Sequence, residues 1–148
     1  MNQVIAYINQ FKGKEFTGTP SPFGKWLNGI VKHVEEGQAQ LEFRVRKEMT
    51  NPAGLLHGGV IASIIDEVIG IATYSLDDNK TKLSINLNID YLAPAKEDDV
   101  VIATASINKK GRQIINATCD LHNQQGKLLA RGYSNLLNSE VPKNKEQG

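Results

Sequence analysis

A long apolar run follows a glycine-containing loop near the middle of the chain. Over residues 60–72 apolar side chains leave no continuous polar face, at Val60, Ile61, Ala62, Ile64, Ile65, Val68, Ile69, Ile71 and Ala72. A helix that is apolar on nearly all sides is buried, and the length of the run favours a helix over a strand. An acidic pair interrupts the run, which is too short to span a bilayer comfortably. The pattern predicts a loop over residues 51–57 and one long buried helix that ends near residues 77–79.

Alternation of apolar and polar residues predicts strands on both sides of this helix. In residues 83–91 the odd positions are apolar and the even positions polar, which is typical of a strand with one buried face. The expected strands are residues 30–35, 38–46, 83–91, 100–108, 112–121 and 127–137, with turns at Gly37, residues 109–111 and residues 123–126. An antiparallel sheet curled around the helix satisfies this order, because the helix must be covered on most sides. The fold class is therefore α+β.

The two ends of the chain lie outside the main pattern of strands around one helix. Val4, Ile5, Ile8 and Phe11 fall at helical spacing and predict a short amphipathic helix, with a loop over residues 13–22 after it. Trp26 and Leu27 are expected to pack this segment onto the body. The expected division of the chain is an N-terminal helix and loop (1–24), a main domain (25–140) and a flexible polar tail (141–148).

Composition narrows the class of protein. A chain of 148 residues is long enough for one domain with a core. With 17 basic and 16 acidic residues there is no basic excess that would indicate a nucleic-acid partner. A single cysteine, Cys119, excludes an intramolecular disulfide and suits a reducing compartment, and no His/Cys cluster indicates a metal. The N-terminus lacks the pattern of a signal peptide, so a cytoplasmic protein without a membrane partner is expected.

Two features of the central stretch carry candidate chemistry. Gly58 and Gly59 bring no side chains to the helix start, so a ligand can approach the unpaired backbone N–H groups and the positive end of the helix dipole. Asp66 lies two turns further on among apolar residues, where a carboxylate is costly unless it is paired or functional. The structural alternatives are a glycine pair that lets the helix start tightly against a strand, and a buried acid that serves the fold.

The spacing of Asn51, the His57-Gly58-Gly59 triplet and Asp66 resembles that of the hotdog-fold thioesterases of the phenylacetate-pathway (PaaI-like) group, in the 4-hydroxybenzoyl-CoA thioesterase superfamily. Downstream, LSINLNIDYLAPAKEDD resembles the central strand of that family and its exit. The resemblance covers residues 25 to 138. It implies the hotdog fold, an antiparallel β-sheet wrapped around one long central α-helix, in chains that pair at least as dimers through one continuous sheet.

The resemblance also implies a reaction, hydrolysis of the thioester of an acyl- or aryl-acyl-coenzyme A. Gly58 N–H would stabilise the developing oxyanion, and Asp66 would act as general base or as nucleophile, two roles that the sequence leaves open. Coenzyme A is part of this substrate, and no separate cofactor is expected. A hotdog hydratase or dehydratase and a non-catalytic acyl-coenzyme A-binding protein are the competing hypotheses.

Further site residues follow from the same resemblance. Asn51 is expected to hold the thioester or water, Ser84 to orient the water, and His57 to brace the loop and the carbonyl. By strand parity Ser84 lies on the polar face, so only a partner chain or a β-bulge would bring it into the site. The expected substrate contacts are Gly59, Asn86 and Tyr91, with a basic turn for the coenzyme A phosphates formed by Lys109, Lys110, Gly111 and Arg112; the expected pocket walls are Ile61, Ile65, Tyr74 and the N-terminal loop. The alternative for the basic turn is a solvated hairpin.

A length argument predicts how the site is assembled. Gly58 and Asp66 are separated by about 12 Å along a helix that rises about 1.5 Å per residue, too far for both to touch one carbonyl. Two antiparallel copies of the helix could bring Gly58 of one chain beside Asp66 of the other. This predicts a homodimer at minimum, and the outer face of the sheet offers a second contact for a homotetramer.

Overall fold

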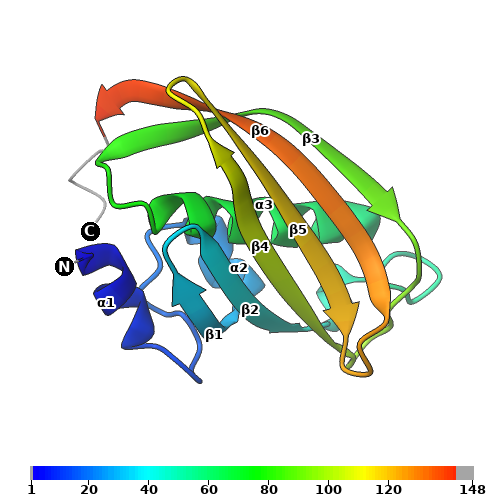
Figure 1. Cartoon of the computed structure of the whole chain (residues 1–148). Coiled ribbons are helices and arrows are strands. Elements are labelled where there is room, and N and C mark those ends of the chain that lie inside the picture. Colours follow the sequence, from blue (N-terminus) through cyan, green and yellow to red (C-terminus); the bar gives the residue numbers. More distant parts are fainter. Residues whose placement is uncertain (1, 143–148) are drawn as a thin grey trace.

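The computed structural model describes residues 2–142, and Figure 1 shows one long helix lying along the concave side of a curved sheet. The elements are α1 (Gln3–Asn9), α2 (Pro22–Leu27), β1 (Ile30–Glu35), β2 (Gln38–Arg44), a 3₁₀ turn at Lys47–Met49, α3 (Gly58–Tyr74), β3 (Lys80–Tyr91), β4 (Val100–Lys110), β5 (Ile114–Asn123) and β6 (Leu128–Pro142). The long helix and all six expected strands are present.

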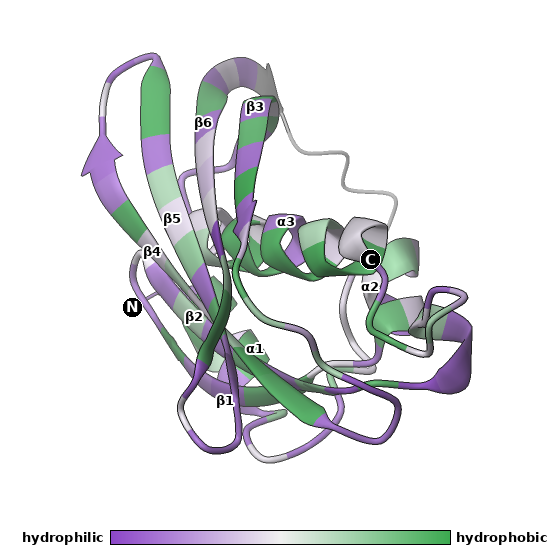
Figure 2. Ribbon diagram, turned by 90° about the vertical axis from the view of Figure 1, so that its right-hand side faces the viewer, coloured by the Kyte–Doolittle hydropathy of each residue, from purple (hydrophilic) through white to green (hydrophobic). Residues whose placement is uncertain are grey.

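One antiparallel sheet holds all six strands. Their order is β1-β2-β4-β5-β6-β3, so β3 comes next after α3 in the sequence but lies at the far edge of the sheet, beside β6. The curved sheet and the helix are also separate layers in Figure 2. This is the expected α+β fold, an antiparallel sheet wrapped around one central helix.

The core lies between α3 and the middle strands. Ile64, Ile65, Val68 and Ile69 of α3 are fully buried against the sheet, where β4 and β5 contribute small side chains that let the helix approach. The helix is not buried on all sides, which corrects the expectation from its composition. Gly59, Asp66 and Gly70 are exposed, Ser63 is half-buried, and the four follow one another at helical spacing, which forms an open stripe. The sheet covers only one side of α3, so this stripe is free in the single chain.

Helix α2 was not predicted, although its start and stop signals are in the sequence. Ser21 caps it by accepting a hydrogen bond from Gly24 N–H (3.0 Å), and Asn28 ends it in the left-handed region. Leu27 is buried as expected, but Trp26 is 41% exposed and stacks on Phe23 instead of packing into the body. Six residues with so few buried side chains are too short to show a helical period.

Several boundaries differ from the predicted ones because hydrogen bonding, not hydropathy, sets strand ends. Strand β4 continues to Lys110, so the β4–β5 turn occupies residues 111–113, where Gly111 N–H donates to Ile114 O (2.8 Å). Strand β6 runs to Pro142, two residues into the predicted tail. The rest of that tail lies outside the described residues. No helix among residues 2–142 has the length and apolar character needed to cross a membrane.

Candidate active site

The start of α3 presents one free backbone donor. His57 is the N-cap residue, and its Nδ1 accepts a hydrogen bond from Gly59 N–H (2.8 Å). Because Nδ1 is an acceptor, the proton of the neutral ring lies on Nε2. Gly58 is the first helical residue, and its N–H donates to no atom of residues 2–142. His57 thus caps the helix through Gly59 N–H, and the Gly58 N–H stays available at the positive end of the helix dipole.

The loop before α3 is fixed by its own polar groups. Asn51 Oδ1 accepts from Ala53 N–H (2.9 Å) and Leu55 N–H (3.1 Å), so the side-chain oxygen serves the turn. From the end of β3, the hydroxyl of Tyr91 donates to Gly58 O (2.8 Å). The structure thus places Tyr91 beside the helix start as a support for it, whereas the side-chain nitrogen of Asn51 donates no hydrogen bond within residues 2–142.

Asp66 and Ser84 come together from α3 and β3. The Ser84 hydroxyl donates to Asp66 Oδ1 at 3.3 Å. Asp66 is exposed on the open stripe and not buried as its apolar neighbours suggested, since the sheet does not cover that side of the helix in the single chain. A carboxylate at an open surface with a hydroxyl beside it can hold and deprotonate a water molecule.

A β-bulge gives Ser84 this orientation. Ser84 pairs with Leu136 and Asn86 with Asn135, so Ile85 is an extra residue in β3. The strand therefore changes parity: Ser84 faces α3, and Leu83 and Ile85 are 50% and 56% exposed. The expectation that Leu83 and Ile85 share a buried face with Leu87, Ile89 and Tyr91 is wrong, and the bulge is the reason.

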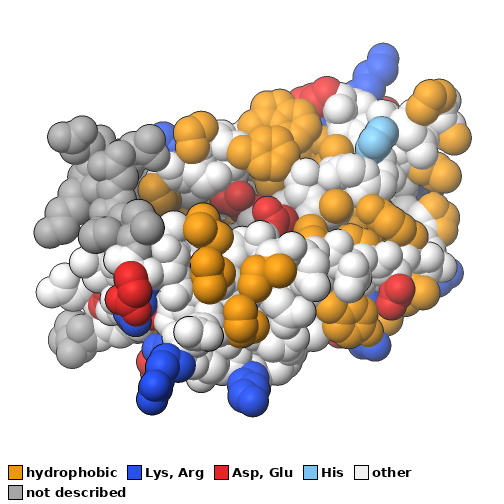
Figure 3. Space-filling model, turned by 90° about the horizontal axis from the view of Figure 1, so that it is seen from above, with side chains coloured by type: hydrophobic (Ala, Val, Ile, Leu, Met, Phe, Trp, Pro, Cys, Tyr) orange, Lys and Arg blue, Asp and Glu red, His pale blue; other side chains and the backbone are white. Residues whose placement is uncertain are grey.

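A cleft of about 300 Å³ opens beside Asp66. On one face of the molecule, acidic side chains lie in a hollow between apolar groups (Figure 3). The cleft is lined by Phe16, Thr19, Pro20, Ser21, Asp66, Glu67, Gly70, Ile71, Thr73, Tyr74, Lys82, Ser84 and Leu136. Tyr74 and the N-terminal loop were predicted as walls and do line it, whereas Ile61 and Ile65 lie on the buried side of α3 and do not.

Glu67 was not among the predicted site residues, and its environment is unusual. Burial raises the pKa of Glu67, the charge of Asp66 adds to this, and a hydrogen bond from Ser21 opposes it. The carboxyl also lies close to Gly24, where an added Cβ would be only 2.4 Å from Glu67 Oε1. Glu67 thus links α3 to the N-terminal end of α2. Together with Asp66 it forms the acidic pair that interrupts the apolar run in the sequence.

The raised pKa of Glu67 predicts a pH-dependent stability effect. A carboxyl whose folded pKa is raised stabilises the fold at low pH, and that contribution is lost as pH rises through the folded pKa. We expect Glu67→Gln, which retains an acceptor for Ser21, to raise Tm at pH 7 and to change it much less at pH 4, where wild-type Glu67 is mostly protonated in both states. Thermal unfolding at both pH values, with the exposed Glu36→Gln as control, measures this. An equal Tm difference at the two pH values would contradict it.

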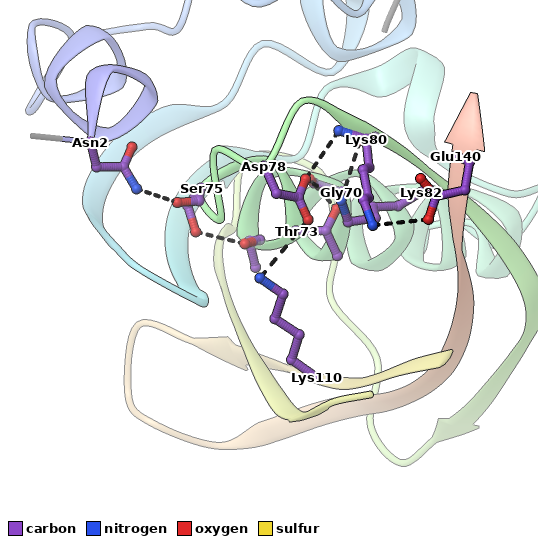
Figure 4. A network of polar contacts seen from close by, with 10 residues as sticks. Asn2, Gly70, Thr73, Ser75, Asp78, Lys80, Lys82, Lys110 and Glu140 are labelled. Carbon is purple, nitrogen blue, oxygen red and sulfur yellow. Dashed lines mark hydrogen bonds and ion pairs between the residues drawn. The ribbon is translucent and has the colours of Figure 1, made fainter. Parts of the chain in front are cut away.

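The basic turn lies at the other end of the helix from Gly58. Lys109, Lys110 and Arg112 are exposed, and Lys110 Nζ is 3.9 Å from Asp78 Oδ2, just beyond the C-terminal end of α3. Figure 4 shows Lys110, Asp78 and Lys82 in one polar network at this end. Within one chain, therefore, the basic turn and Gly58 are not brought together.

Lys82 is the least exposed charged group of that network and was not singled out from the sequence. Its side chain is 4% exposed and its Nζ contacts Asp78 Oδ1 (2.5 Å). Burial would raise the pKa of Asp78, but hydrogen bonds from Lys82 and Lys80 N–H and the charges of Lys82 and Lys110 outweigh it and lower that pKa. The predicted strand began at residue 83 and did not include Lys82; in the structure Lys82 lies on the same face of β3 as Ser84, before the bulge, and lines the cleft with it.

The architecture and the site define a hotdog-fold protein with a carboxylate and a free helix-start N–H on one long helix. The family model described as Thioesterase superfamily matches residues 53–130. The chain is 34% identical to human acyl-coenzyme A thioesterase 13, over 65% of this chain and 69% of that one. It is 31% identical to the medium/long-chain acyl-CoA thioesterase YigI of Escherichia coli, over 78% and 84%. The crystal structure of zebra fish thioesterase superfamily member 2 matches with a TM-score of 0.76 and 28% identity, over 93% of this chain and 95% of that one.

The chain belongs to the thioesterase superfamily, and the relatives reported above are named as acyl-coenzyme A thioesterases, which is consistent with a thioester hydrolase. The resemblance of the sequence motifs to hotdog thioesterases of the PaaI-like group is thereby confirmed. The matched segment contains the start of α3, Asp66, Ser84 and the basic turn, whereas Asn51 lies just before it.

Proposed function

We propose that this protein hydrolyses acyl-coenzyme A thioesters to the free acid and coenzyme A. The observation that carries the proposal is the Ser84–Asp66 pair, a carboxylate with a 3.3 Å hydroxyl contact on the open stripe of α3 and beside a cleft of about 300 Å³. Relatives named as acyl-coenzyme A thioesterases support the choice of substrate class. Coenzyme A enters as part of the substrate, so the proposal requires no other cofactor.

The proposed reaction uses the groups already described. Gly58 N–H polarises the thioester carbonyl and stabilises the oxyanion that forms there. In the general-base route, Asp66 takes a proton from a water that Ser84 orients, and the water oxygen attacks the carbonyl carbon. The C–S bond then breaks, and the thiolate of coenzyme A takes up the proton. In the nucleophilic route, Asp66 attacks the carbonyl carbon first, the C–S bond breaks and coenzyme A leaves as its thiolate. Water then hydrolyses the resulting mixed anhydride, which releases the free acid and restores the Asp66 carboxylate, and the thiolate takes up the remaining proton.

Thiol release from a panel of acyl-coenzyme A esters, aliphatic and aryl, tests this function. We expect steady turnover with at least one ester. Hydration of an enoyl-coenzyme A without thiol release would favour the hydratase hypothesis, and binding without turnover would favour a non-catalytic acyl-coenzyme A-binding protein.

The proposed site contains two chains. Gly58 and Asp66 are about 12 Å apart along one helix, so Gly58 of one chain serves Asp66 of the other. Two features support a partner: the open stripe on α3 and the edge strand β3, whose Leu83 and Ile85 are 50% and 56% exposed. An edge strand with exposed apolar side chains is a template for pairing with another chain. We expect a homodimer at least, and a homotetramer through the outer face of the sheet. Sedimentation that finds a fully active monomer would contradict the two-chain site.

We propose that the basic turn contacts the coenzyme A phosphates of the bound substrate. Neutralising Lys109, Lys110 and Arg112 together is expected to raise KM about tenfold for an acyl-coenzyme A and much less for the matching acyl-pantetheine, which lacks the nucleotide. The difference should shrink with added salt. Lys127→Gln, on the exposed β5–β6 turn, is the control. Equal changes in KM for both esters would show that the basic turn is a solvated hairpin that does not contact the nucleotide.

A further inference from the structure

The bulge in β3 has a dedicated acceptor. At the bulge the side chain of Asn86 takes the place of a main-chain carbonyl: its Oδ1 accepts from Asn135 N–H at 3.0 Å and from Asn135 Nδ2 at 3.3 Å. The main-chain oxygen of Asn86 in turn accepts from the hydroxyl of fully buried Ser134 at 2.9 Å. Main-chain donors within a sheet require acceptors, so these three contacts stabilise the two-against-one pairing that the extra residue creates.

The same contacts extend across the outer face of the sheet. Asn135 Oδ1 accepts from Asn116 Nδ2 (3.0 Å), and Asn116 Oδ1 accepts from Asn108 Nδ2 (3.1 Å). A row of asparagines thus runs from β4 through β5 and β6 to the bulge on β3. The row connects Asn135, and therefore the acceptor contact of Asn86, to β4 and β5 in the middle of the sheet.

The position of Ser84 depends on this bulge. A strand alternates its side chains with a period of two, so a slip of one residue sends each side chain to the opposite face. Without the extra residue, Ser84 would point to the outer face and could not reach Asp66. Asn86 itself is engaged by β6, and its exposed side chain takes no part in the Ser84–Asp66 contact.

We propose that Asn86 is a positioning residue, which holds the bulge so that the Ser84 hydroxyl stays against Asp66, and that it is not the substrate contact that the motif implied. The proposal rests on the proposed function, because Ser84 and Asp66 act on the thioester there. According to this proposal, Asn86 affects turnover only because it positions Ser84.

Four single variants and one double variant test this. Asn86→Ala removes the acceptor and is expected to lower kcat about tenfold with little change in KM, matching Ser84→Ala. Asn86→Asp retains an oxygen that accepts from both donors of Asn135 and is expected to restore most of the turnover. Asn88→Ala is the matched control, since Asn88 lies one alternation further along β3 and its side chain makes no hydrogen bond within residues 2–142. In the Ser84→Ala background, Asn86→Ala should add almost nothing.

A second readout does not depend on activity. The amide proton of Asn135 should exchange faster with solvent in Asn86→Ala than in wild type, and at the wild-type rate in Asn86→Asp and Asn88→Ala. If the alanine variant yields too little folded protein, Asn86→Ser, whose side chain is shorter, replaces it in both measurements.

Each outcome decides between the roles. A rise in KM at unchanged kcat would make Asn86 a substrate contact and overturn the proposal, as would an undiminished loss of turnover in the Ser84→Ala background. Unchanged exchange at Asn135 would show that the bulge does not need Asn86. A wild-type protein that releases no thiol, with the exchange pattern as expected, would refute the thioesterase function and leave the role of Asn86 in the bulge intact.

Discussion

Asp66→Asn is expected to lower kcat by about 100-fold or more, the typical effect of losing a positioned general base. The amide retains the shape of the side chain and can still contact the Ser84 hydroxyl, but it neither takes a proton from water nor attacks a carbonyl effectively. KM should change far less, because the thioester carbonyl is held by Gly58 N–H and not by Asp66.

Stability provides the second arm of that measurement. A buried carboxylate would make the asparagine variant more stable, but Asp66 is exposed in the chain, so its Tm should stay close to that of wild type. Asp90→Asn, another exposed acid presented by strand β3, is the control for loss of one negative charge. Near-normal turnover of Asp66→Asn at unchanged Tm would remove Asp66 from the mechanism and with it the proposed chemistry of the open stripe.

The parts of the fold that local pattern determines were predicted. The apolar run over residues 60–72 and the alternation of residues 38–46 each reflect one element packed on one core, and both elements formed. The arrangement of the strands came from the motif resemblance, because alternation says which face of a strand is buried but not which strand lies beside it. Helix α2 was missed because six residues are too few for a periodic signal. The helix is stabilised by its N-cap and by Arg46, whose guanidinium donates to Trp26 O and lies over the Trp26 ring.

The candidate site was harder to predict because long-range contacts orient its side chains. Ser84 could be assigned to its face only through the bulge, which depends on Asn86 and Asn135, residues 49 positions apart. Lys82 lies on the same face of β3 as Ser84, where no hydropathy pattern would place a lysine. Asp66 was expected to be buried because its neighbours in sequence are apolar, yet those neighbours face the sheet and Asp66 faces the open stripe.

Gly58→Pro is the second substitution with a large expected effect, and the local geometry makes it selective. Proline is favoured at the first helical position, where its missing N–H has no partner within the helix. The preceding residue must be extended, and His57 already is, at φ −62° and ψ 135°. The variant should therefore fold, lose the oxyanion donor, and turn over about 100- to 1,000-fold more slowly. Gly58→Ala retains the N–H, and its Cβ would meet the Tyr91 ring at an ordinary 3.4 Å, so it should lose much less.

Combining the two inactive variants tests whether each site contains both chains. In a heterodimer of one Asp66→Asn chain and one Gly58→Pro chain, a two-chain site restores one complete pair, Gly58 from the first chain and Asp66 from the second, and leaves the other site doubly defective. Heterodimers purified through two different affinity tags should therefore regain about half of the wild-type turnover per dimer, while each homodimer stays nearly inactive. If Gly58 and Asp66 acted within one chain, every site in the heterodimer would lack one group and no turnover would return. Recovery of activity on mixing thus separates the two-chain site from a single-chain one.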